Sequence, residues 1–428
     1  MQKNISTCHL KIIQTNFQLL LRKIFICPLK RGDIISAYPK IFNTMLEKKI
    51  RIGYISPANP FDRKALSGTP YKIGETLRSI GAELVWIQVK QSNAYKLYDK
   101  ICRIFNKIFP NKILFSHTAL GATLLSKSLD LNMVKEMDLL FAPFSSDALF
   151  NINKDILPPP IMYLSDATFE RMVGYYFHNL YGWNIKEGNS IEQKAQDISS
   201  QLIFSSNWAA SSAIEFYHQP ASKVHVIEFG ANIDDKDIVK KTFVYNGTLH
   251  LLFLGVDWER KGGDLAVEAC KELNEMGIKS VLHVVGIRSL SSEIKSLPFV
   301  DYVGFLDKNN PEEYNKLISL IRMCHCLLLP TKAECSAIAF CESSANGLPV
   351  FSHITGGVRN YVEDGVNGYL LPLGSTGKDF ADKIKECLES GELERMSFTA
   401  TELYKQKLNW KVWGEKVEKL IRETLELL

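Results

Sequence analysis

The stretch LLPTKAECSAIAFCESSANGLPV, residues 328–350, holds two glutamates, Glu334 and Glu342, among residues that are mostly small or apolar. Its beginning continues an apolar strand-like run, and its middle has the composition of a helix, so it predicts a strand, a loop and a helix in succession. A buried carboxylate without a partner is costly. The pair therefore indicates that a ligand or backbone amides satisfy both side chains, unless Glu334 is solvated and Glu342 caps or pairs locally.

Apolar runs of the same kind recur on both sides of this stretch, with helically spaced segments between them. They lie at 49–56, 83–89, 137–143, 160–165, 201–206, 223–230, 249–255, 279–286, 298–306, 326–330 and 349–353. Short apolar runs separated by helices are typical of mostly parallel sheets that are covered on both faces. The sequence therefore predicts an α/β protein.

The length of the chain, 428 residues, exceeds what one hydrophobic core usually organises, so two domains are expected. A polar, turn-rich segment near residues 230–246 separates two series of runs. We predict a basic extension over 1–49, an N-terminal α/β domain over 50–235, a second α/β domain over 236–408, and a C-terminal helix over 409–428. Ligands are expected in the cleft between the two domains.

Composition and charge narrow the classes of function. Hydrophobic residues make up 46% and charged residues 23% of the chain, as in ordinary globular proteins. The formal net charge of +4 is small for this length, so nucleic acid is not an expected partner. The nine cysteines are odd in number and scattered, which predicts reduced, buried thiols in a cytoplasmic protein. Cys324 and Cys326 are interpreted as core residues, because no second pair at zinc spacing accompanies them. The Asp235 to Asp237 pair is interpreted as a solvated turn.

The two ends of the chain carry separate predictions. Residues 1–49 hold nine Lys or Arg against Asp33 and Glu47, and their apolar run is too short to span a membrane. One interpretation of these residues is a poorly ordered extension, with Met45 as an alternative start. The other is a basic apolar segment in peripheral contact with an anionic membrane. The apolar residues of 409–428 recur at steps of three and four, which predicts a helix with one buried stripe.

Three loops of the second domain are expected at the carboxyl ends of strands, where open α/β sheets bind ligands. Arg260 and Lys261 precede two glycines at a helix N-terminus, and cations there call for an anion such as a diphosphate. An exposed basic turn explains that loop equally well. Glu334 lies in the second loop, and a carboxylate suits the vicinal hydroxyls of a ribose or a sugar. Thr355 begins the third loop, TGG.

The order of these motifs resembles the C-terminal half of retaining glycosyltransferases of the GT-B fold, family 4. The motifs are RKGGD, VVG, GFL, PTKAEC, GLPV, GGV and VEDGVNGYLL, with Glu334 and Glu342 in E-x7-E spacing. Similarity extends over about residues 50–428. The resemblance implies a GT-B fold of two Rossmann-like doubly wound domains with a cleft between them. It also implies a hexosyltransferase that moves a sugar from a nucleotide-diphosphate sugar to an acceptor hydroxyl.

The resemblance implies roles for individual residues as well. As catalytic residues it indicates Glu334 near the donor sugar, Arg260 and Lys261 at the diphosphate, and Asp166 where many relatives carry a histidine. Glu342 is expected to hold the ribose of the donor. The further donor-binding residues are Gly68, Thr69, Gly262, Ser336, Ala337, Ile338, Gly356 and Gly357. No metal ligand is implied, and no cofactor, because the nucleotide sugar is a substrate.

Two positions depart from the family pattern. Val256 stands where relatives commonly carry Arg after the glycine, so Arg260 is expected to supply that charge, and Ala337 replaces a usual glycine. Two alternatives therefore stay open, a GT-B-like sugar-nucleotide epimerase and a nucleotide-sugar-binding protein without transfer activity. The expected acceptor is a carbohydrate or a lipid-linked carbohydrate used in glycan or polysaccharide synthesis. The expected location is the cytoplasm or the inner face of the cell membrane.

Overall fold

The computed structural model describes residues 49–62, 68–152, 158–238 and 242–426. Residues Ile50–Leu428 form one compact unit. The basic extension predicted over 1–49 lies outside the described residues except for Lys49, so the predictions about it, including the alternative start at Met45, stay predictions.

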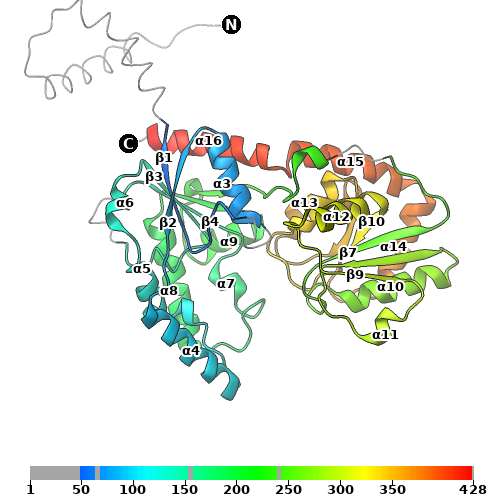
Figure 1. Ribbon diagram of the computed structural model, residues 1–428, viewed down its shortest axis with the longest axis horizontal. Helices are drawn as coiled ribbons and strands as arrows, with labels where there is room; N and C mark the ends of the chain where they lie inside the picture. Colours follow the sequence, from blue (N-terminus) through cyan, green and yellow to red (C-terminus); the bar gives the residue numbers. More distant parts are fainter. Residues whose placement is uncertain (1–48, 63–67, 153–157, 239–241, 427–428) are drawn as a thin grey trace, which may run out of the picture. The chain divides into compact units, whose positions relative to one another are not determined.

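The first sheet has six parallel strands in the order β2-β1-β3-β4-β5-β6 (Figure 1). The strands are β1 (Arg51–Ser56), β2 (Glu83–Gln88), β3 (Leu139–Pro143), β4 (Ile161–Ser165), β5 (Gln201–Phe204) and β6 (Val224–Val226). Every residue of β3 and β4 is buried. Parallel strands covered on both faces read as continuous apolar runs, which is why β3 and β4 are visible in the sequence.

Among the residues that the structure describes, seven α-helices accompany this sheet, and sheet and helices together form the first half of the unit. They are α3 (Thr69–Ser79), α4 (Asn93–Ile108), α5 (Ala119–Ser126), α6 (Leu131–Lys135), α7 (Phe169–Met172), α8 (Gly182–Ile198) and α9 (Asn207–Glu215). Five of them begin after a side chain that accepts a hydrogen bond from a backbone N–H of the first turn. The capping residues are Ser92, Thr118, Asp130, Thr168 and Ser206.

The second sheet also has six parallel strands, in the order β12-β11-β10-β7-β8-β9. The strands are β7 (Leu249–Leu254), β8 (Ser280–Val285), β9 (Val300–Gly304), β10 (Cys326–Leu328), β11 (Val350–His353) and β12 (Gly368–Leu371). The strand order reverses between β7 and β10, and a crevice for ligands forms at the carboxyl ends of strands at such a point.

In the described part of the chain, six α-helices accompany the second sheet and complete the second half. They are α10 (Gly263–Glu275), α11 (Ser292–Lys295), α12 (Pro311–Met323), α13 (Ile338–Ala345), α14 (Gly377–Glu389) and α15 (Glu392–Gln406). The predicted α/β class with two doubly wound sheets is confirmed. β12 was not among the predicted strands, because GYLL is short and begins with a glycine.

The last helix, α16 (Trp410–Glu426), packs on the first half although it follows the second (Figure 1). Its apolar stripe joins one buried cluster with residues of β1, β3, β4, β5 and α3. Trp413 is fully buried, with its ring 6.2 Å from that of Phe141 and 5.5 Å from that of Trp410. The stripe predicted over 409–428 therefore covers a face of the first sheet.

Several smaller predictions can be followed in the structure. The seven described cysteines are all buried, as predicted for them. Asp235–Asp237 form a short 3₁₀ helix, where Asp237 accepts a hydrogen bond from the Tyr314 hydroxyl at 3.0 Å. Of the described helices, none combines the length and the apolar composition needed to cross a membrane.

Because Trp413 fills the space between α16 and the first sheet, Trp413→Ala is expected to leave a large cavity. Truncation of a buried aromatic ring costs about 3–5 kcal/mol, so the free energy of unfolding should fall by that amount. Urea denaturation followed by circular dichroism measures the loss. Lys419→Ala on the same helix is the control, since the Lys419 side chain is 78% exposed. Equal stability of the two variants would contradict the packing role.

Candidate functional site

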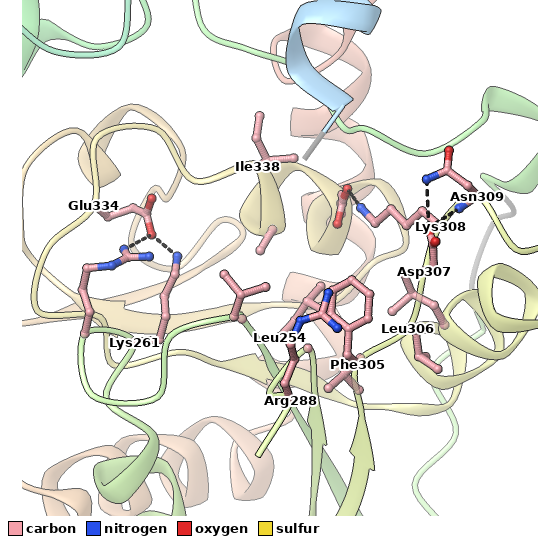
Figure 2. Close-up of a pocket in the computed structure, with 18 of the residues that line it drawn as sticks. Leu254, Lys261, Arg288, Phe305, Leu306, Asp307, Lys308, Asn309, Glu334 and Ile338 are labelled. Atoms are coloured by element: carbon pink, nitrogen blue, oxygen red, sulfur yellow. Dashed lines mark hydrogen bonds and ion pairs between the residues drawn. The ribbon is translucent and has the colours of Figure 1, made fainter. Parts of the chain in front are cut away.

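A pocket of about 510 Å³ opens where the strands of the second sheet end. Its walls come from the ends of β7, β8 and β9, from the loop after β10, and from the start of α13. Figure 2 shows Glu334 and Lys261 at one side of the pocket and Lys308 at the other. All of its lining residues belong to the second half, so the pocket itself is not formed between the two halves.

Two cationic side chains lie beside Glu334 at its side of the pocket. Its carboxylate pairs with the Lys261 ammonium and lies 3.7 Å from the Arg260 guanidinium. Only 9% of the Glu334 side chain and 11% of the Lys261 side chain are exposed, so water screens this contact weakly. Glu334 follows β10 and the two cations follow β7, which are the neighbouring strands at the reversal of strand order.

Two tyrosines of the first half hold the loop that carries Glu334. The Glu334 N–H donates to the Tyr175 hydroxyl at 2.7 Å, and that hydroxyl lies 2.7 Å from Thr355 Oγ1. The Tyr176 hydroxyl accepts from Arg260 at 3.0 Å, and the guanidinium also lies over the Tyr176 ring. Burial raises the pKa of both tyrosines, so both keep their protons at neutral pH.

The double glycine after β11 lets two loops meet behind Glu334. Gly356 has φ 49°, and a Cβ there would lie 2.2 Å from the Glu334 carbonyl oxygen. A Cβ at Gly357 would lie 2.0 Å from the Cys335 carbonyl oxygen, and the Gly357 N–H donates to the Glu334 carbonyl at 3.0 Å. Neither glycine lines the pocket, so their visible role is to position the Glu334 loop.

Glu342 occupies the other side of the pocket, on the second turn of α13. It is buried, and its Oε1 pairs with the ammonium of Lys308, which follows β9. A carboxylate has two oxygens, so Oε2 is left for a further donor. Lys308 was missed from the sequence, because a lysine in the polar segment DKNN looks like any exposed turn.

Within the protein, a lysine pairs with each carboxylate. Glu334 is therefore buried rather than solvated, and Glu342 pairs with a lysine 34 positions away rather than locally. The reason is electrostatic, because a buried carboxylate needs a counter-charge within hydrogen-bond distance to offset its lost hydration. Each lysine carries three donors, so the pairing leaves donors for an anion or a hydroxyl.

Asp166 lies just after β4 and approaches the same loop from the first half. Its carboxylate accepts from the Ser336 hydroxyl at 3.4 Å, but Asp166 does not line the pocket. Burial raises the pKa of Asp166 to about 6, and the nearby Glu334 charge adds to the shift. Ser336 and Glu334 therefore connect Asp166 to the pocket without placing it inside.

The other predicted residues divide between the pocket and its surroundings. Ile338 lines the pocket, as does Ser336, whereas Ala337 is the buried residue that precedes α13. Gly262 precedes α10 and Gly68 precedes α3, and neither lines the pocket. Thr69 is also outside it, and its hydroxyl accepts from the Asn232 side chain at 3.0 Å.

Two further lining residues were not anticipated as site residues. The Arg288 guanidinium lies 3.9 Å from the centre of the Phe305 ring, and both side chains face the pocket (Figure 2). They follow β8 and β9. The signal that could have found them is their position after the VVG motif and within the GFL motif. Val256, where the resemblance led us to expect Arg, lines the pocket and is 71% exposed.

Comparison with known proteins classifies the part of the chain that holds the pocket. Residues 234–402 match the model of a family described as Glycosyl transferases group 1. This segment is similar to glycosyl transferases group 1 domains. Every residue that lines the pocket lies within the matched segment.

Relatives of the chain align mainly through part of their length. An uncharacterized glycosyltransferase of Methanocaldococcus jannaschii is 25% identical over 187 residues, which are 43% of this chain and 52% of that protein. The D-inositol 3-phosphate glycosyltransferase of Mycolicibacterium smegmatis is 23% identical over 207 residues, which are 46% of this chain and 47% of that protein. The chain spans about half the length of these curated relatives.

The similarity in fold extends beyond the matched segment. The crystal structure of HepE from Anabaena, in complex with UDP-glucose, superimposes with a TM-score of 0.60 and 16% identity. The match covers 89% of this chain and 100% of that one. It confirms the predicted GT-B fold for both halves together.

Asp166 is expected to make the free energy of unfolding depend on pH. Its pKa is raised in the folded state, so its contribution to stability is present below the ordinary pKa of aspartate and is lost as pH rises through about 6. Asp166→Asn carries no charge. The free energy of unfolding of Asp166→Asn relative to that of the parent should therefore rise by on the order of 1 kcal/mol between about pH 5 and pH 8, as measured by urea unfolding. Asp382→Asn, at an exposed position of α14, is the matched control. A constant difference between Asp166→Asn and parent at both pH values would refute the shift.

Proposed function

We propose that the chain is a retaining glycosyltransferase of family 4, which transfers a sugar from a nucleotide-diphosphate sugar to an acceptor hydroxyl. The observation that carries this proposal is the arrangement of two carboxylate–lysine pairs around one pocket, Glu334 with Lys261 and Glu342 with Lys308. A nucleotide sugar carries both kinds of group that such pairs bind, hydroxyls for the carboxylates and a diphosphate for the cations.

The donor lies across the pocket in this proposal. Glu342 accepts hydrogen bonds from the ribose hydroxyls through the oxygen that Lys308 leaves free, and Glu334 lies beside the transferred sugar. The diphosphate then lies between them, within reach of Lys261 and Arg260. Ser336 and Ile338 line the wall between the two glutamates and contact the donor.

Loss of the sugar places negative charge on the diphosphate. Lys261 and Arg260 stabilise that charge more strongly in the transition state than in the ground state, which lowers the barrier. Because two cations oppose the leaving group, the proposal needs no metal ion. Retention of configuration follows if the leaving phosphate accepts the proton of the acceptor hydroxyl on the same face of the sugar. The tyrosines behind Glu334 keep the reacting groups in place.

The comparisons support the class of donor and of reaction. The matched relatives include a D-inositol 3-phosphate glycosyltransferase, and the HepE structure holds UDP-glucose. The acceptor is a carbohydrate or a lipid-linked carbohydrate in polysaccharide or glycoconjugate synthesis, handled in the cytoplasm or at the inner face of the cell membrane. The Tyr-rich segment 163–183 of the first half, which reaches the Glu334 loop, is placed to shape that side.

A nucleotide-sugar-binding protein without transfer activity is the second candidate. The exposed apolar Val256 favours it, because the pocket has no cation at that position. The two candidates differ in turnover, since a binding protein holds the donor but neither transfers nor hydrolyses the sugar. Turnover of the donor without any acceptor would instead indicate an epimerase.

The nucleotide can be identified by thermal shift. A ligand that binds only the folded state raises the melting temperature, and at a hundredfold excess over its Kd it adds about 2.7 kcal/mol of stability. UDP, GDP, ADP and their sugar conjugates are compared, and one nucleotide should stand out. Glu342→Gln should reduce that shift. An equal response to all of them, or none, would contradict a nucleotide-sugar site.

Substitutions on the two sides of the pocket are expected to affect different kinetic constants. Glu342→Gln weakens a contact made in both ground and transition states, so it should raise KM and leave kcat nearly intact at saturating donor. Lys261→Met removes a charge that opposes the leaving group, so kcat should fall by about 10²- to 10³-fold. Initial rates over a range of donor concentrations measure both.

Lys271→Met is the matched control for Lys261→Met, because Lys271 lies on α10 with 60% of its side chain exposed. Melting temperatures show whether each variant is folded. Full turnover of folded Lys261→Met at saturating donor would show that this lysine does not serve the leaving group.

A further inference from the structure

Helix α4 is attached to the first half by one face only. Tyr95 and Cys102 are its buried residues. The Asn106 side chain donates to the Ile113 carbonyl at 2.9 Å and accepts from the Ile113 N–H at 2.7 Å, which fixes the C-terminal turn. Ser92 caps the other end by accepting from the Tyr95 N–H. The helix therefore has a complete inner face and well-defined ends.

The opposite face of α4 carries aliphatic residues that solvent reaches. Leu97 is 60% exposed, Ile101 55%, Ile104 51% and Ile108 69%. They recur at steps of four, three and four, which places them in one stripe along the helix. A helix normally turns such a stripe toward the core, and a contiguous exposed apolar patch marks an interaction site.

Cations accompany the stripe along one edge. Each aliphatic residue is directly preceded by a basic one, in the pairs Lys96-Leu97, Lys100-Ile101, Arg103-Ile104 and Lys107-Ile108. All four basic residues are exposed. The only acidic residue of the helix, Asp99, pairs with Arg103 at 2.6 Å. The stripe thus runs beside a row of positive charge.

Aromatic rings extend the stripe beyond the end of the helix. Phe109 is 42% exposed and Trp183, at the start of α8, is 46% exposed. Stacked and tilted ring contacts join them through Phe105 and Tyr181, with centroid distances of 4.1, 5.9 and 6.3 Å. Exposed Trp and aromatic rings of this kind are enriched where proteins meet the interface of a bilayer.

We infer that this α4 surface, the stripe with its four basic residues, Phe109 and Trp183, docks on a bilayer that contains anionic lipid. The apolar stripe enters the headgroup region while the lysine and arginine stems extend to lipid phosphates. A protein partner fits less well, because lysine is depleted at the centre of protein interfaces. Figure 1 shows α4 at the edge of the first half remote from α16, which leaves its outer face accessible.

The inference does not rest on the proposed function, and its test needs no turnover. The full chain is sedimented with vesicles of phosphatidylcholine and phosphatidylglycerol, and with vesicles of phosphatidylcholine alone. The parent should bind the anionic vesicles. Ile101→Gln with Ile104→Gln should lower partitioning at least about tenfold, because two apolar side chains no longer enter the interface. Lys100→Gln with Lys107→Gln should lower it about thirtyfold, because each basic residue near an anionic surface adds about fivefold.

The control replaces two equally exposed apolar residues of the second half, Val244→Gln with Leu373→Gln, which should bind as the parent does. All variants should keep the parent's melting temperature and its shift with nucleotide, because α4 lies outside the pocket. Unchanged vesicle binding by both α4 variants would overturn the inference. So would a dimer in lipid-free sedimentation velocity that the Ile101→Gln, Ile104→Gln variant loses, with no vesicle binding by the parent.

Discussion

The buried charge of Glu334 is the constraint around which the pocket is organised. A carboxylate with so little exposure is tolerated only with cations beside it, and the fold supplies them from the loop after the neighbouring strand. The reversal of strand order between β7 and β10 is what makes these loops neighbours. The main chain of Glu334 is also held on both sides. Its carbonyl oxygen accepts a hydrogen bond from the Gly357 N–H, and its own N–H donates one to the Tyr175 hydroxyl.

This arrangement links the chemistry to the relation between the halves. Tyr175 and Tyr176 come from the first half, yet they bond the loop that presents Glu334 and the guanidinium of Arg260. A shift of that segment would therefore change the geometry of the pocket without any substitution in the pocket itself. A ligand that contacts segment 163–183 would be in a position to influence the pocket in this way.

The sequence was informative where burial leaves a local trace. Buried parallel strands read as apolar runs, and a carboxylate among small apolar residues is visible without a structure, so Glu334 and Glu342 could be found. Lys308 could not, because its partner is 34 positions away and its own surroundings are polar. The contact of Tyr175 with Glu334 joins residues 159 positions apart, which periodicity does not encode. Helical spacing also fails to tell which face of α4 is turned inward, since the helix has apolar residues on both.

Helix α16 has a consequence for how the chain is made. During synthesis the first sheet leaves the ribosome long before α16, because all of the second sheet is translated between them. Until Trp413 and its neighbours arrive, one face of the first sheet lacks its cover of aromatic and aliphatic side chains. The apolar surface of the first half is therefore exposed until α16 has been translated. During that period chaperones can bind this surface, and incomplete chains are prone to aggregate through it.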